Sequence, residues 1–325
     1  MKRAVSQNQL LAWAAGLLVL ASLPSLATAA SRLDGHGDAQ RLPHGFADWV
    51  QFGAALTASL LLAAMVTTRT VGHEGATRRR LLTQRTAVAA CTLSWLYTTT
   101  PASSPLARHL GTAVYGVVLA WLAIEVCRAS GARLSSGFDI ADRDQRLRTW
   151  GITSWFYLLC VAGSFLVTMS EQLLRTAGFD NALIVGLDQR STLGLVGPAE
   201  GVLAFIATVA IEDVVIVAAT ATLLAKARRP TWHIYTAICL VEVAVHAYMG
   251  ISALAFAVLT ASRIWLYRRY QGFLPLAVAH LVFNISVLLK WFAPGLPTMV
   301  IALMLATAAI LGVAPRRAGK TGATA

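Results

Sequence analysis

Five ionisable residues lie deep inside apolar segments in the C-terminal half of this 325-residue chain: Glu212, Asp213, Glu242, His246 and His280. Ionisable groups are costly at membrane depth, so each of them is a candidate functional residue. A buried glutamate can act as a general base on water, and a nearby imidazole can hold that water or relay its proton. The set therefore predicts hydrolysis inside a membrane-embedded cavity.

Two pairs of polar residues are spaced so that each pair shares one helix face. His280 and Asn284 are four residues apart, and so are Glu242 and His246. Residues at i and i+4 are neighbours on a helix surface. A histidine with an asparagine can donate hydrogen bonds to a developing oxyanion. Glu242 can orient the imidazole of His246 as a supporting residue.

The candidate residues are also expected at one depth. A rise of about 1.5 Å per residue places Glu212, His246 and Asn284 about 20–22 Å from the cytoplasmic ends of their helices. Glu212 and Asp213 are adjacent, about 100° apart around the axis, so only one should aim squarely at a shared site. No Lys or Arg is expected at this depth, because Arg263 is close enough to a segment end to extend to the interface.

A metal centre is the alternative use of the same side chains. Glu212, His246 and His280 could hold a divalent cation such as zinc, which would activate water. The chain has no HExxH motif. We therefore favour a mechanism that requires no cofactor and keep the metal as the alternative.

The composition defines the class of protein that must position these residues. Hydrophobic residues make up 57% of the chain and charged residues 13%, whereas a soluble domain carries about 25% charged residues. Apolar runs near 20 residues recur along the chain, which predicts an all-α, polytopic helical membrane protein. The four cysteines form no CxxC pair, so no disulfide framework is expected.

We expect ten transmembrane helices, or nine if the first is a cleaved signal peptide. Lys2 and Arg3 precede the first apolar run, and Ala27-Thr28-Ala29 resembles a signal-peptidase site. We favour a retained helix because the run is long enough to span a bilayer. The ten segments lie near residues 9–30, 48–68, 86–103, 106–127, 150–169, 201–225, 232–250, 251–267, 273–291 and 295–314.

Basic residues cluster on every second loop, which predicts that both termini are cytoplasmic. The net charge of +12 is therefore explained by topology, and no nucleic-acid partner is expected. An integral protein of a bacterial plasma membrane is the expected location. The clusters lie at Arg69 to Arg85, Arg128 to Arg148, Lys226 to Arg229, Arg263 to Arg269 and Arg316 to Lys320.

The order of these motifs resembles the CPBP intramembrane proteases, also called the Abi or CAAX prenyl endopeptidase family. That family has EExxxR on one helix, FxxxH on the next and HxxxN near the end. The counterparts here are Glu212-Asp213, His246 and His280-Leu-Val-Phe-Asn284, with gaps of 34 residues from Glu212 to His246 and 34 from His246 to His280. The resemblance covers roughly residues 195–295.

Three positions depart from the family pattern. The second glutamate is Asp213, the family's arginine falls on Val217, and the phenylalanine before the second motif's histidine falls on Glu242. The missing arginine removes a partner that would position the acidic pair. Catalytic activity is therefore the property that the resemblance supports least.

The resemblance implies roles for individual residues. Glu212 is similar to the base that activates water, with His246 assisting it. His280 and Asn284 are similar to the oxyanion stabilisers, and Asp213 to a supporting residue. The implied substrate is a membrane-associated protein or peptide in the lipid bilayer.

The chain is expected to have three parts. Residues 1–194 form transmembrane helices of unassigned role, and residues 195–295 form the protease-like core. Residues 296–325 form a last helix with a basic tail. The leading function is an intramembrane endopeptidase. One alternative is a non-catalytic, diverged relative such as an immunity or scaffold protein. The other is a proton-coupled transporter, which would be expected to have an internal repeat.

Overall fold

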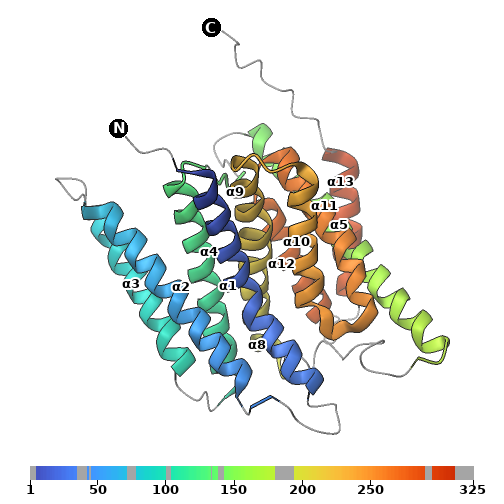
Figure 1. The fold of residues 1–325 in the computed structure, drawn as a ribbon. Helices are drawn as coiled ribbons and strands as arrows, with labels where there is room; N and C mark the ends of the chain where they lie inside the picture. The colour runs from blue at the N-terminus through green and yellow to red at the C-terminus, as the bar shows by residue number, and fades with distance from the viewer. Residues whose placement is uncertain are drawn as a thin grey trace.

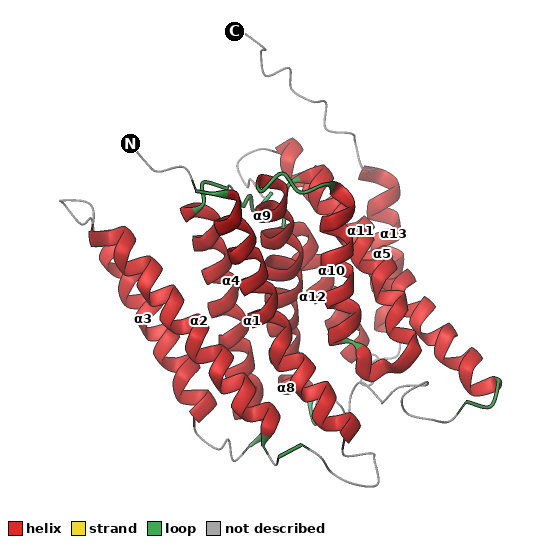
Figure 2. Cartoon of the chain, in the orientation of Figure 1, coloured by secondary structure: helices red, strands yellow, loops and turns green. Residues whose placement is uncertain are grey.

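The computed structural model describes residues 5–34, 42–43, 45–71, 78–99, 104–132, 134–137, 143–179, 194–289 and 295–311. Within these ranges every element is a helix, as the sequence predicts (Figure 2). The elements are α1 (Gln7–Asp34), α2 (Phe46–Val71), α3 (Arg78–Thr99), α4 (Pro105–Ala129), α5 (Arg143–Thr176), α8 (Pro198–Val209), η1 (Ala210–Ala219), α9 (Thr220–Lys226), α10 (Thr231–Val245), η2 (Ala247–Leu254), α11 (Ala255–Tyr270), α12 (Leu274–Leu289) and α13 (Leu296–Leu311).

Every predicted apolar segment overlaps one helix or one run of consecutive helices. Six helical runs among the described residues are long and apolar enough to cross a membrane. Helices α10 and α12 and most of α13 are apolar but shorter. The fold is therefore that of a helical membrane protein. The six runs are Gln7–Ser31, Phe46–Thr68, Pro105–Ala129, Arg146–Thr176, Pro198–Lys226 and Ala247–Tyr270.

The helices lie side by side, with α2 and α3 at one edge and α13 beside α5 at the other (Figure 1). The start of α1 and the end of α13 lie on the same face of the bundle (Figure 1). The ends of α4, α9 and α11 reach that face too, and their last turns contain Arg128, Lys226, Arg268 and Arg269. We call this the basic face. The Arg316 to Lys320 cluster lies outside the described residues.

Hydrogen bonds brace the basic face across elements that are distant in sequence. Gln7 Nε2 donates to the carbonyl oxygen of Ala227 at 2.8 Å, which ties α1 to the end of α9. The backbone amide of Leu274 donates to the carbonyl oxygen of Ser136 at 3.0 Å, which ties the start of α12 to the segment after α4. Gly137 and Gly272 meet backbone to backbone at the same place, where a Cβ on either would collide with the other chain segment.

The opposite face contains the end of α1 and the starts of α2, α4 and α8 (Figure 1). Asp34 ends α1, and Asp48 and Glu200 lie in the first turns of α2 and α8. Acidic residues are favourable at helix N-termini because of the helix dipole. Arg108, in the first turn of α4, also lies at this face, which therefore carries charges of both signs.

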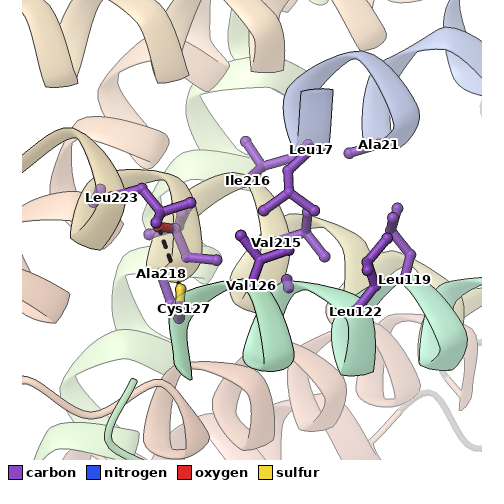
Figure 3. Packing of buried hydrophobic residues seen from close by; sticks show 14 of the residues in the cluster. Leu17, Ala21, Leu119, Leu122, Val126, Cys127, Val215, Ile216, Ala218 and Leu223 are labelled. Carbon is purple, nitrogen blue, oxygen red and sulfur yellow. Dashed lines mark hydrogen bonds between the residues drawn. The ribbon is translucent and has the colours of Figure 1, made fainter. Parts of the chain in front are cut away.

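An apolar core joins α1, α4, η1 and α9. Leu17 of α1, Val126 of α4 and Ile216 of η1 are almost completely buried against one another (Figure 3). The Cys127 thiol faces the carbonyl oxygen of Ala219 at 4.0 Å (Figure 3), and all four cysteines are unpaired, as predicted. Ala21 of α1 belongs to the same core.

A glycine sets the distance between α4 and α8. A Cβ on Gly116 would lie 2.9 Å from the Cα of Ala207. Small residues at helix interfaces allow backbones to approach closely in membranes. Gly116 therefore determines how near the N-terminal helices stand to the helical run that contains Glu212.

We expect Gly116→Val to separate α4 from α8 and to lower the stability by about 1–3 kcal/mol, since overpacking displaces the backbone. The measurement is the thermal unfolding midpoint of the purified protein in detergent. Gly53→Val is the matched control, because nothing lies within 4 Å of a Cβ there. Equal midpoints for the two variants would contradict the role given to Gly116.

Candidate functional site

Arg263 stands at the centre of a buried ion cluster. Its side chain is 1% exposed and comes from α11. Nη2 lies 2.9 Å from Glu212 Oε2 and 2.8 Å from Asp213 Oδ1, and Nη1 lies 3.2 Å from Glu242 Oε1. One guanidinium therefore binds three carboxylates from η1 and α10. Charged groups at this depth are tolerated only when they are paired in this way.

The proton positions around His280 follow from counting hydrogens. Its Nδ1 lies 2.9 Å from Asp213 Oδ2 and 3.2 Å from Arg263 Nη2. Both hydrogens of Nη2 are directed to Glu212 and Asp213. Nδ1 must therefore be the donor to the Asp213 carboxylate, and the approach to Arg263 is a close contact of two donors. The other ring nitrogen, Nε2, stays available.

His246 is oriented by its own helix and by an aromatic ring. Its Nδ1 lies 2.8 Å from the carbonyl oxygen of Glu242, to which it donates. The imidazole stacks on Phe256 at a centroid distance of 3.8 Å. Nε2 then lies 3.9 Å from Glu212 Oε1. This distance exceeds that of a hydrogen bond, and both atoms can accept one from a shared donor.

The local backbone explains how adjacent acidic residues reach the same partner. Glu212 and Asp213 lie in η1, a π-helical stretch whose hydrogen bonds run from i to i+5. A π-helix turns less than 100° per residue, so neighbouring side chains diverge less than on an α-helix. Both therefore bind Arg263, although only Glu212 of the pair lines the cavity, as expected for one of two adjacent residues.

A break in the next helical run places His246. Helix α10 ends at Val245, and His246 follows with a φ of −97° and ψ of 8°. Gly250 inside η2 has a φ of 63° and ψ of −146°, which favours glycine. The chain therefore turns within the bundle before α11 begins. This turn brings His246 and Phe256 together and starts the helix that contains Arg263.

Arg263 is the residue that the sequence analysis missed. The prediction that it extends to an interface is wrong, since four other site residues surround it in the interior. Val217, where the resemblance expects an arginine, is completely buried and apolar. The sequence did contain a signal for a buried arginine. Three acidic residues were expected at depth with no Lys or Arg beside them, and such an excess of negative charge requires a cation.

The site forms part of the wall of a cavity of about 910 Å³. Glu212, His246, His280 and Asn284 all line it, which are the four residues predicted to take part directly. Asp213 and Glu242 are completely buried behind them. The two carboxylates predicted to be supporting residues therefore contact the site through Arg263, His280 and His246.

A metal could be held by a set that differs from the predicted one. Glu212, Glu242 and His246 offer ligand atoms that lie within 4.8 Å of one another. Glu242 Oε2 has no hydrogen-bond partner among the described residues. His280 instead binds Asp213. Arg263 already binds both glutamates, so a cation there would stand beside a fixed positive charge.

No protein-family model, no curated protein and no solved structure matches this chain.

We expect Arg263→Met to destabilise the protein by about 3–5 kcal/mol, because it leaves three buried carboxylates without their shared partner. The readouts are the yield of monodisperse protein and its thermal unfolding midpoint. Arg269→Met on the exposed side of the same helix is the control and should change stability by about 0.5 kcal/mol or less. A stable Arg263→Met variant would contradict the structural role of the cluster.

Proposed function

We propose that this protein is an intramembrane endopeptidase that uses Glu212 to activate water. The observation that supports this most strongly is the pairing of Glu212 with His246 on the wall of the cavity. His280 and Asn284 line the same cavity, so a base and two polar groups suited to an oxyanion face one space. General-base catalysis requires the base to be accessible to water, and the cavity supplies that access.

In the proposed reaction, a water molecule lies between Glu212 Oε1 and His246 Nε2. Its oxygen forms a bond to the scissile carbonyl carbon as Glu212 takes its proton. The carbonyl oxygen becomes an oxyanion, which accepts a hydrogen bond from the Asn284 amide and from His280 Nε2–H. The C–N bond then breaks, and the proton on Glu212 passes to the leaving amine.

Asp213 binds the ring nitrogen of His280 that does not face the oxyanion in this proposal. Its carboxylate accepts a hydrogen bond from Nδ1–H at 2.9 Å. An oxyanion donor must also bear hydrogen at Nε2, so the useful form is the imidazolium. Asp213 holds the ring in place through its Nδ1–H. The proposal thus gives Asp213 a positioning role and explains why it is buried behind the histidine.

The CPBP resemblance is part of this proposal, with one change. In the family pattern the arginine follows the acidic pair on the same helix, whereas here Arg263 approaches the pair from α11. Arg263 thus supplies from another helix the guanidinium that is missing at position 217. This favours a catalytic site over a non-catalytic relative. We further propose ten membrane crossings, both termini in the cytoplasm of a bacterial cell, and a membrane-associated protein as substrate.

A proton-coupled transporter is the second candidate. The turn at Gly250 interrupts a helical run beside the cavity, and transporters use such discontinuous helices at their binding sites. Buried Glu and His residues can also relay protons. Proton flux into liposomes that depends on Glu212 would favour this function over proteolysis.

We expect Glu212→Gln to abolish cleavage while the fold persists, because the amide still binds Arg263 but cannot take a proton. The measurement compares protein N-termini in membranes from cells with the wild type, with the variant, or without the gene. Glu200→Gln, in the same helical run but outside the cavity lining, is the control and should cleave normally. New termini that persist in Glu212→Gln would exclude Glu212 as the base.

We expect EDTA to leave cleavage unchanged, because Arg263 already supplies the positive charge that the carboxylates require. The assay follows the new N-termini in detergent-solubilised membranes before and after chelation. Loss of cleavage with EDTA, and its return with added zinc, would replace the metal-free mechanism with a metal-dependent one.

A further inference from the structure

The cavity extends beyond the candidate site to the face opposite the basic face. At its inner end it is lined by Glu212 and His280. At its other end it is lined by Asp34, Asp48 and Arg108, which lie at the end of α1 and in the first turns of α2 and α4. One continuous space therefore joins the ion cluster to that face.

The wall changes character along this path. Near the site it is chiefly apolar, with Phe205, Phe256, Leu259 and Phe283 among its residues. An apolar wall around a few polar groups is typical of a ligand site, and a volume of 910 Å³ suits a ligand larger than one amino acid.

Toward the opposite face the same wall becomes polar. Ser25 and Thr28 of α1, Gln51 of α2 and Thr112 of α4 line it. Gln51 Nε2 donates to Thr112 Oγ1 at 3.1 Å, which links α2 to α4 across this part of the wall. The N-terminal helices thus form a polar entrance, while the C-terminal helices supply the reactive groups.

Charge fixes which compartment this entrance faces. Arg128, Lys226, Arg268 and Arg269 lie at the other end of the bundle. Positively charged ends of membrane proteins stay in the cytoplasm. The entrance formed by α1, α2 and α4 is therefore at the extracytoplasmic end.

We propose that the site takes its substrate from the extracytoplasmic side, through an entrance built by α1, α2 and α4. The substrate class is a membrane-inserted peptide whose apolar stretch reaches Glu212 and His246 and whose polar end projects from the outer surface. The chemical outcome rests on the proposed function, whereas the entrance and its direction rest on the cavity and the charged faces alone.

Cysteine accessibility in intact cells tests the direction. The parent variant is Cys160→Ala, because Cys160 is the cysteine in the cavity wall, and it reports background labelling of the other three. We expect a membrane-impermeant maleimide to label Thr112→Cys in the entrance and Thr208→Cys near the site. Gln271→Cys at the basic face should be labelled only after the membrane is permeabilised. The reverse pattern would overturn the proposal.

Two further variants show that the cavity is the route. Val117→Cys lies on α4 outside the cavity and is 48% exposed on the helix surface; it should stay unlabelled at the depth of the membrane. Thr112→Trp, added to Thr208→Cys, should remove labelling of the inner cysteine by blocking the entrance. Persistent labelling of Thr208→Cys behind Trp would overturn the assignment of α1, α2 and α4 as the entrance.

The substrate class is tested with a synthetic peptide that joins an Ala/Leu block to a Ser/Gly tail. We expect this peptide to protect Thr208→Cys from the maleimide, and a Ser/Gly peptide of equal length to give no protection. Equal effects of the two would overturn the substrate class. Labelling and protection should be the same in Glu212→Gln, so a failed hydrolase proposal would leave the entrance intact and a failed entrance would leave Glu212 untouched.

Discussion

The pairing of one guanidinium with three buried carboxylates is the constraint on which the rest of this structure depends. Arg263 joins α11 to η1 and α10, and through Asp213 it reaches His280 of α12. Each of these charges would be prohibitively costly alone in an apolar interior. Their sum leaves the cluster with more acid than base when the histidines are neutral. This one cluster therefore holds η1, α10, α11 and α12 together in the interior of the bundle.

The cluster contains two kinds of side chain, those that line the cavity and those that are buried behind them. Glu212, His246, His280 and Asn284 face the cavity, whereas Asp213 and Glu242 contact them from behind. The π-helical turn at Glu212 and the break after Val245 are the local departures that allow this division. Irregular backbone at membrane depth is tolerated where it lines a cavity, which is where both departures are found.

Periodicity and composition were sufficient to predict the helical class and the shared faces. His280 and Asn284 follow i, i+4 spacing on a regular helix, so both line the cavity as expected. Spacing also predicted that only one of Glu212 and Asp213 faces the site, but it did not predict the π-helical stretch that lets both bind Arg263. It also failed for Arg263, because the expected segment ended near residue 267, whereas α11 continues to Tyr270 and Arg263 lies in its middle, among its buried partners.

The hydrogen-bonded contacts at the basic face give the bundle a mechanical asymmetry. At that end, Gln7 is tied to Ala227, and the backbone of Leu274 to that of Ser136. At the other end, the walls of the cavity meet mainly through side chains such as Gln51 and Thr112. The contacts that join distant segments thus use backbone groups at the basic face and side chains at the other end. We therefore expect a bulky ligand to displace the helices more readily where Gln51 meets Thr112 than where Leu274 is hydrogen-bonded to Ser136.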